Sequence, residues 1–213
     1  MIKEISTKTF QKSIVLVAVI LFLATSNAVF AKNYYVSNLG LNTNAGTLEL
    51  PFKTIDYAVK YSGLAAGDTI FIRGGTYPER VKMSKSGTAN GRITVINYPG
   101  EIPVIDGTGI NIPSNEFAMF ELRASYVTID GLSVKNAVIF GGVKRDDGIW
   151  ANRGGSQCIR VLGPNVQQVT IRNCKVTNCL SSGIAVWGYS GKNNFTGATD
   201  ILIENNVNNY TWI

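Results

Sequence analysis

One alternating pattern of apolar and polar residues recurs along the chain, and each copy ends in a residue suited to a tight bend. Alternation over about five positions is the pattern of a β-strand with one buried face. The residue that follows is Gly or Asn, which tolerates left-handed backbone. The copies are Val127–Leu132, Val169–Cys174, Ile201–Asn206 and, more weakly, Val104–Gly107.

The bend positions set the size of the repeat. Gly107, Gly131, Asn173 and Asn205 are 24, 42 and 32 residues apart. Coils of a parallel β-helix hold about 20 to 30 residues each, so the longer intervals contain loop insertions. The pattern predicts an all-β fold, a parallel β-helix solenoid, which is typical of extracellular proteins that act on polysaccharides.

A short helix is predicted ahead of the coils. Phe52, Ile55, Ala58 and Val59 fall at i, i+3, i+6 and i+7 and draw one apolar face. Strands are expected on either side, at Tyr34–Ser37 and Thr69–Arg73. A solenoid must cover the open end of its core, so we assign the helix to an N-terminal cap over residues 32–78, followed by coils over 79–213.

Residues 1–31 are predicted to be a secretory signal peptide. Lys3, Lys8 and Lys12 precede an apolar run from Ile14 to Ala24, and Val29–Ala31 has small residues at the usual cleavage spacing. The alternative is a membrane anchor, but about 11 apolar residues are short against the roughly 20 that span a bilayer. We therefore expect a secreted protein, extracellular or periplasmic, with no membrane association after cleavage.

Charge narrows the expected partners. Without residues 1–31, 17 basic and 13 acidic side chains remain, and the net charge falls from +6 to +4. The basic residues are scattered, with no run typical of nucleic-acid binding. We expect no nucleic-acid partner, a monomer, and a diffuse preference for acidic ligands such as uronic-acid polymers.

The chain has no histidine and three cysteines. The absence of histidine excludes imidazole bases, Ser-His-Asp hydrolysis and His-rich zinc sites in this polypeptide. Cys158, Cys174 and Cys179 are too few for a disulfide scaffold. One pair could oxidise after export, but the sequence does not choose which, and packing as small apolar residues is the favoured interpretation.

The N-terminal half resembles a known family. The segments that carry the resemblance are Tyr34–Ser37, Gly46–Thr47, Pro51–Ile55, Ala58–Val59, Gly67–Ile70, Gly75–Tyr77, Ser84–Thr88, Ile93–Val95 and Ile105–Gly107. They resemble secreted right-handed parallel β-helix (pectin-lyase-like) proteins, closest to calcium-dependent bacterial pectate lyases with a lysine base. The resemblance covers residues 34–136 closely and implies a right-handed solenoid, an acidic polysaccharide substrate and Ca²⁺ as cofactor.

The sequence lacks the catalytic motifs of several related enzyme families. Polygalacturonases need a Gly-His-Gly element, and a second pectate lyase type needs a Trp-Ile-Asp-His motif; neither exists without histidine. The Gln-Asp-Thr-Leu motif of pectin methylesterases is absent. Asp146–Asp147 is the only Asp pair, so the Asp cluster of the calcium-dependent lyases is incomplete, and no catalytic lysine is assigned by motif.

The end of the chain leaves a coil uncovered. The sequence stops at Ile213, just after a repeat, whereas solenoids normally close with a polar cap. We expect catalytic coils to follow Ile213 in a longer protein. The alternative is a complete short β-helix closed by dimerisation.

Two insertions, 137–157 and 188–200, are predicted to wall a groove over one sheet. Cys158–Leu162 and Gly183–Trp187 align as the same strand on successive coils, with Phe120–Arg123 as predecessor. Inward Ile159 and Val161 then turn Arg160 outward beside Glu121, and Trp187 also points out. The alternative for Arg160 and Glu121 is a surface ion pair.

The insertions carry residues suited to sugars, because aromatic faces lie near donors for carboxylates. We predict substrate binding by Arg160, Trp187, Lys144, Arg153, Trp150 and Tyr189, and metal binding by Asp146 and Asp147. The alternatives are loop packing for the aromatic residues and a plain turn at Asp146–Gly148.

The predicted function is a polysaccharide lyase that cleaves a uronate glycan by β-elimination. Such a reaction needs a cation or Arg to neutralise the uronate, and a base to remove the adjacent proton. Without histidine that base must be Lys, Arg or Tyr. The alternative is a noncatalytic glycan-binding or structural β-helix; an esterase would need two Asp and an Arg on neighbouring coils, which the sequence does not show.

Overall fold

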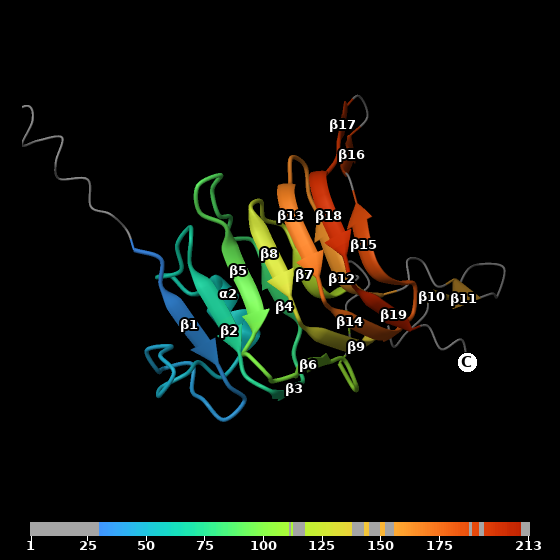
Figure 1. Ribbon diagram of the computed structural model, residues 1–213. Coiled ribbons are helices and arrows are strands. Elements are labelled where there is room, and N and C mark those ends of the chain that lie inside the picture. The colour runs from blue at the N-terminus through green and yellow to red at the C-terminus, as the bar shows by residue number, and fades with distance from the viewer. Residues whose placement is uncertain are drawn as a thin grey trace, which may run out of the picture. The chain divides into compact units, whose positions relative to one another are not determined.

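The structure is a computed structural model of the 213-residue chain (Figure 1). It describes residues 30–110, 112, 118–137, 143–144, 150–151, 156–187, 189–191 and 194–209. Within the described residues, no helix is long and apolar enough to cross a membrane.

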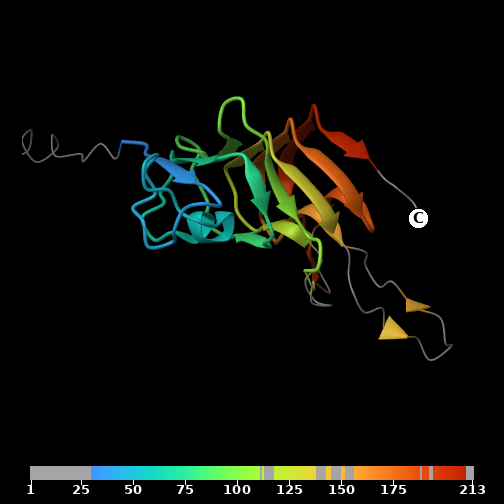
Figure 2. The ribbon, with the colours of Figure 1, turned by 90° about the horizontal axis from the view of Figure 1, so that it is seen from below.

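Three parallel sheets form the fold, and the chain visits them in turn. Sheet A has the order β1 (Asn33–Val36), β2 (Thr69–Ile72), β5 (Ile93–Asn97), β8 (Val127–Asp130), β13 (Gln167–Arg172) and β18 (Thr199–Glu204). Sheet B has β3 (Gly75–Tyr77), β6 (Pro103–Asp106), β9 (Ser133–Ala137), β14 (Lys175–Cys179) and β19 (Val207–Asn209). Sheet C has β4 (Val81–Met83), β7 (Ala118–Leu122), β12 (Gln157–Leu162) and β15 (Ser182–Trp187). The predicted parallel β-helix is confirmed, and Figures 1 and 2 show its coils stacked from the blue strands to the red ones.

Ladders of apolar side chains form the core between the sheets. In sheet A, Ile70, Val95, Ile129, Ile171 and Ile203 are neighbours in register. The first four are fully buried, whereas Ile203 on the last described coil is 44% exposed. Each fully buried aliphatic side chain contributes about 1.5–3 kcal/mol relative to an exposed one, so stacking the coils is the main source of stability.

The bend between sheets A and B has the predicted backbone. Gly131, Asn173 and Asn205 have φ of 68°, 54° and 54°, in the left-handed region that Gly and Asn tolerate. The weaker copy Val104–Gly107 was misplaced, because β6 belongs to sheet B and Gly107 follows that strand. The sheet A strand of that coil is β5, whose apolar positions pair with β8.

The predicted helix exists but is shorter than its apolar pattern. Helix α2 (Ile55–Lys60) begins after Thr54, whose hydroxyl accepts a hydrogen bond from the Tyr57 amide. Phe52 lies outside the helix, in a bridge with Val36, and is fully buried. Phe52, the first apolar position of the predicted helix, is therefore in extended backbone and not in the helix.

The range 32–78, predicted as a cap, also holds coil strands. β1 and β2 pair with each other and β2 with β5, while β3 pairs with β6. Helix α2 buries Ile55, Ala58 and Val59. The same sheets A and B therefore run through the cap range and the coil range.

Candidate functional site

Charged residues form one row on the outer side of sheet C. In register, Lys82 on β4 neighbours Glu121 on β7, which neighbours Arg160 on β12. Their strand neighbours Val81, Phe120 and Ile159 face the core and are fully buried. Alternation along each strand turns the charged side chains away from that core.

The alignment predicted from sequence is confirmed. Ile159, Arg160 and Leu162 pair with Ile184, Ala185 and Trp187 on β15. The expected proximity of Arg160 and Glu121 is confirmed by the same kind of register.

Glu121 is an ion-pair partner of Arg123. Arg123 Nε donates to Glu121 Oε1 at 2.6 Å, and the two side chains are 53% and 5% exposed. The Arg123 guanidinium is therefore held at the surface by a buried carboxylate. Such a charge-assisted bond fixes the cation in one place.

Arg160 lies in a mainly buried environment. It is 8% exposed, and Glu121 is 4% exposed. Burial lowers the pKa of Arg160, and the nearby Arg123 also lowers it, while Glu121 raises it. The alternative predicted an ion pair of Arg160 and Glu121 at the surface. It is wrong about their exposure, because both side chains are buried on the outer sides of β7 and β12.

Trp187 sits at the edge of this row. Its side chain is on the last strand of sheet C and is 48% exposed. The Arg160 guanidinium carbon lies 5.6 Å from the centroid of the Trp187 ring, within the range of a cation–π contact. The structure thus brings together two of the predicted site residues.

Arg123 and Lys82 were not among the predicted site residues, although the structure makes them the more accessible cations of the row. A sequence signal existed for both. Lys82 is the polar residue between Val81 and Met83, and Arg123 is two positions after Glu121. Alternation alone places both on the outer side of sheet C.

Both predicted insertions adjoin sheet C in the chain. The first joins β9 to β12 and contains the antiparallel pair β10 (Val143–Lys144) and β11 (Trp150–Ala151). The second joins β15 to β18 and contains the antiparallel pair β16 (Tyr189–Gly191) and β17 (Asn194–Thr196).

Of the remaining predicted site residues, three have a described backbone position. Lys144 pairs with Trp150 in the first insertion, and Tyr189 pairs with Thr196 in the second. Arg153 and the predicted metal ligands Asp146 and Asp147 lie outside the described residues.

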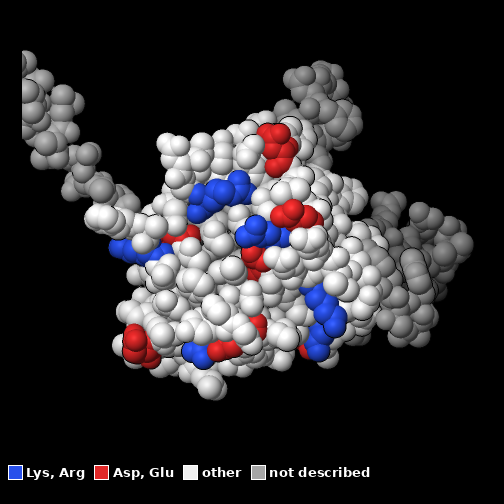
Figure 3. Space-filling view, viewed as in Figure 1, with Lys and Arg blue, Asp and Glu red and all other residues white. Residues whose placement is uncertain are grey.

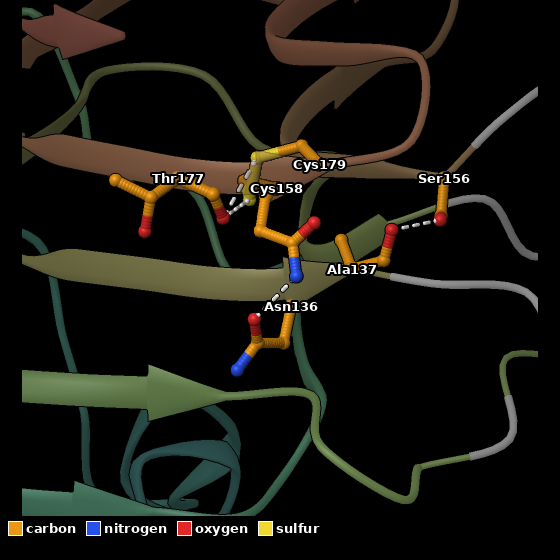
Figure 4. Close-up of a disulfide and its surroundings, with 7 residues drawn as sticks. Asn136, Ala137, Ser156, Cys158, Thr177 and Cys179 are labelled. Carbon is orange, nitrogen blue, oxygen red and sulfur yellow. Dashed lines mark hydrogen bonds between the residues drawn. A yellow bond between two sulfur atoms is a disulfide. The ribbon is translucent and has the colours of Figure 1, made fainter. Parts of the chain in front are cut away.

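A disulfide holds the start of β12, the strand that follows the first insertion. Cys158 on β12 is bonded to Cys179 on β14, with Cα atoms 5.5 Å apart (Figure 4). Beside it, the Ser156 hydroxyl donates to the Ala137 carbonyl, and the Leu180 amide donates to the same carbonyl at 3.1 Å. Both ends of the insertion are therefore tied to sheets B and C. The favoured interpretation of three unbonded cysteines was wrong, and only Cys174 is free.

The row on sheet C does not suit a divalent cation. Its carboxylate, Glu121, is paired with Arg123 and flanked in register by Lys82 and Arg160, and positive neighbours repel a metal ion. Among the described residues, no three Asp, Glu, His or Cys side chains cluster as metal ligands would. The predicted Ca²⁺ ligands, Asp146 and Asp147, lie outside those residues.

The sheet A side of the molecule presents a different charge pattern. Figure 3 shows several basic side chains on this face in contact with acidic ones, with largely uncharged surface around them. Arg172 bonds to Asp130 at 2.7 Å, and Arg73 bonds to Glu101 at 2.7 Å. Two basic side chains on this face, Arg172 and Arg73, are thus paired with acidic neighbours.

Comparison with known proteins places the fold in a family. Residues 34–209 match the model of the Pel9A-like, right handed beta helix region. Pectate lyase PEL9 of Emericella nidulans is 41% identical over 88 residues, which are 40% of this chain and 21% of that protein. The uncharacterized protein YwoF of Bacillus subtilis is 31% identical over 136 residues, 63% of this chain and 28% of that protein. The matched regions thus span about a quarter of the length of these relatives.

Solved structures agree on the fold. A rhamnogalacturonan lyase superposes with a TM-score of 0.57 at 21% identity, covering 70% of this chain and 36% of that one. The pectate lyase Pel9A superposes with a TM-score of 0.51 at 18% identity, covering 87% and 48%. A GH136 lacto-N-biosidase from Eubacterium ramulus reaches 0.56 at 18% identity, covering 81% and 30%.

Proposed function

The chain belongs to the Pel9A-like right-handed β-helix family, and on this premise we propose that it acts on an acidic polysaccharide as part of a lyase. The observation that carries the proposal is the cationic row of sheet C, formed by Lys82, Arg160 and Arg123, on strands that two insertions adjoin in the chain. A uronate of the polymer would be bound at the exposed part of this row, at Arg123, and not over the covered outer sides of β7 and β12. The name of the related PEL9 protein supports a pectate-type substrate.

The chemistry assigned to the row is binding and charge neutralisation. Arg123 is held at the surface by Glu121, and its outward donors are available to a carboxylate. Lys82 adds a second positive charge, and Trp187 offers an aromatic face for the C–H side of a pyranose. Neutralising a uronate carboxylate makes the proton on the adjacent carbon more acidic, which is what β-elimination requires.

Arg160 has a supporting role in this proposal. Because it is mostly buried and lies over Trp187, it raises the positive potential of the row and holds the indole in place. Lys144, Trp150, Tyr189 and Arg153 are proposed to contact the polymer from the insertions. The base that removes the proton is left unassigned.

Calcium is proposed at Asp146 and Asp147, since carboxylates are its preferred ligands. When bound there, the ion would neutralise the uronate next to the arginines. Titration of the full chain with Ca²⁺, followed by calorimetry, should give a signal that Asp146→Asn with Asp147→Asn abolishes. Equal heats in both proteins would contradict the proposal.

Export is proposed from the disulfide and the N-terminal sequence. The Cys158–Cys179 bond is typical of proteins that mature in an oxidising compartment. Residues 1–31 are proposed as the signal that directs the chain there. Mass spectrometry of the exported protein should find Lys32 at its N-terminus.

The test of activity is the absorbance of unsaturated uronates when the full chain is incubated with polygalacturonate or alginate, with Ca²⁺ or with chelator. A rise supports a lyase. Binding of the polymer without a rise in absorbance supports a noncatalytic binding protein. If there is neither a rise nor binding, the proposal is contradicted.

The role of the row is tested by a matched pair of arginines. Arg123 and Arg172 each form one short ion pair with a buried carboxylate and are 53% and 44% exposed, but Arg172 is on sheet A. Arg123→Ala should weaken polygalacturonate binding roughly tenfold, the size of one charge-assisted hydrogen bond, whereas Arg172→Ala should leave it unchanged. Equal losses would mean that sheet C is not the binding face.

A further inference from the structure

An open pocket of about 430 Å³ lies beside helix α2, next to the Lys82 end of the row on sheet C, since the Lys82 amide donates to Asp56 Oδ1 at 2.9 Å. Its walls are helix α2, the residues that follow it, and the loop after β1. The pocket is lined by Asn42, Thr54, Asp56, Tyr57, Lys60, Tyr61 and Ser62. Its volume falls within the range of about 300–1,000 Å³ typical of small-molecule sites.

Two tyrosine rings line the pocket and are held from behind. Tyr57 and Tyr61 are partly exposed, and their centroids are 6.2 Å apart with ring planes at 38°. The fully buried Phe52 contacts both, at 5.1 Å and 4.9 Å between centroids. Tyr34 packs edge-on against Tyr61 at 5.3 Å. The two rings are therefore fixed before any ligand arrives, so little conformational entropy is lost on binding.

The charged side chains that line the pocket, Asp56 and Lys60, are paired with each other, and Lys85 next to it is bound to the carbonyls of Tyr61 and Ser62. Lys60 donates to Asp56 Oδ2 at 2.6 Å. Asn42 donates to the Thr54 hydroxyl at 3.1 Å, and its oxygen accepts from the amides of Lys53 and Thr54. These side chains present fixed donors and acceptors beside an aromatic surface.

The pocket and the cationic row differ in the ligand that each suits. In the row, Lys82 and Arg160 are in register with Glu121, which pairs with the exposed Arg123, and these cations favour anions. In the pocket the single lysine is paired with the single aspartate. An aromatic surface with paired polar groups suits a ligand with one C–H face and several hydroxyls.

We infer that this pocket binds a neutral pyranose unit of a polysaccharide, at a site that adjoins the Lys82 end of the cationic row but has its own lining residues. The tyrosine rings pack against the C–H face of the sugar, and Asp56, Lys60 and Asn42 exchange hydrogen bonds with its hydroxyls. The inference goes beyond the proposed uronate chemistry and does not depend on catalysis. A protein with both sites would hold a polymer that has acidic and neutral stretches.

The test uses saturation-transfer NMR on the full chain with cellotetraose and β-1,4-galactotetraose as neutral probes and tetragalacturonate as the acidic one. Ser62→Trp places a bulky side chain in the pocket without removing a core contact, since Ser62 is exposed. Thr76→Trp is the matched control, because Thr76 is exposed on β3 and does not line the pocket. Tyr57→Leu is a second variant that keeps an apolar contact with Phe52 but removes the aromatic face.

The expected result is a saturable signal from a neutral probe, with an affinity in the millimolar range typical of so small a ligand. Ser62→Trp and Tyr57→Leu should each weaken it at least tenfold, and Thr76→Trp should not. If Ser62→Trp fails to fold, Tyr57→Leu decides alone. A missing signal from both neutral probes, or binding that survives the pocket variants, overturns the inference.

The two proposals fail separately. Tetragalacturonate binding that is lost in Arg123→Ala but kept in Ser62→Trp belongs to the row. If the acidic probe does not bind at all while a neutral probe does, the pocket stands and the uronate proposal falls.

Discussion

Burial controls the chemistry of single residues in this solenoid. Cys174 is 1% exposed, and burial raises the pKa of its thiol to about 11. Tyr77 is 2% exposed, and burial likewise raises its pKa to about 12, while its hydroxyl donates to the Arg73 carbonyl at 2.8 Å. Neither group ionises at neutral pH, so both serve the fold.

The thiol of Cys174 should be unreactive in the folded protein. A thiol reagent needs access and a thiolate, and Cys174 offers neither, while Cys158 and Cys179 are bonded to each other. Titration with a chromogenic disulfide reagent should find no reactive thiol in the native chain, one after denaturation, and three after denaturation with reduction. A fast-reacting native thiol would show that Cys174 is exposed or that the disulfide does not form.

Strands of sheet B are joined by a polar ladder at their ends. Asn178 donates to Asn136 Oδ1 at 2.7 Å, and Asn136 donates to Asp106 Oδ1 at 2.9 Å. Lys135 lies 3.1 Å from the other oxygen of Asp106. Partial burial raises the pKa of Asp106, but hydrogen bonds from Thr108, Asn136 and Lys135 outweigh it and hold the pKa well below its usual range.

Because of Asp106, the free energy of unfolding should fall at acidic pH. Because its pKa is depressed in the folded state, its contribution is present above the unfolded pKa of about 3.9 and is lost as pH falls through the folded value. Asp106→Asn should lower the free energy of unfolding by about 1–2 kcal/mol at pH 7, with a smaller difference from wild type below about pH 4. Urea unfolding at several pH values measures this, and Glu49→Gln, at an exposed position, is the control. A difference that does not change with pH would contradict the charge-based explanation.

The disulfide between β12 and β14 should stabilise the coils as well as the base of the first insertion. It closes a loop with a sequence separation of 21, for which removal typically costs about 2–4 kcal/mol. Cys158→Ser with Cys179→Ser should lower the midpoint of urea unfolding accordingly, and reduced wild type should match the double variant. An unchanged midpoint in both would mean that the bond adds nothing to stability.

The whole molecule is held together by contacts between neighbouring coils. Outside the core, Arg92, which directly precedes β5, donates to the Thr128 and Thr170 hydroxyls, each at 3.1 Å, and so ties the start of β5 to β8 and β13. Tyr35 and Phe71 stack on the same sheet with centroids 5.4 Å apart. In a solenoid each coil is stabilised by the coils on its two sides.

Protection from hydrogen exchange should therefore vary along the solenoid. Ile129 and Ile171 are fully buried, whereas Ile203 and Val207 on the last described coil are 44% and 51% exposed. In the 213-residue chain, amides of β8 and β13 should exchange at least tenfold more slowly than those of β18 and β19, because the last coil has fewer contacts to break. Uniform exchange would indicate that the chain opens as one cooperative unit.

Alternation predicted much of the charged row on sheet C. From inward Ile159 and Val161, alternation correctly predicted that Arg160 lies on the outer side of the sheet. The predicted alignment of Cys158–Leu162 with Gly183–Trp187 is confirmed by the strand register. It could not predict that Arg160 and Glu121 would be buried, because exposure depends on what packs over a strand and not on the strand itself. For the same reason Arg123 emerged as the accessible cation only in three dimensions.

By itself the sequence determined the local features of this protein: which strand faces are apolar, where Gly131, Asn173 and Asn205 make the bend, and that imidazole chemistry is excluded. These follow from the chemistry of a few consecutive residues. Only the tertiary structure decided that β6 belongs to sheet B, that Cys158 pairs with Cys179, and that Tyr57 and Tyr61 line a pocket. Each of those depends on distances between residues far apart in the chain, which stacking of the coils sets and a local pattern does not encode.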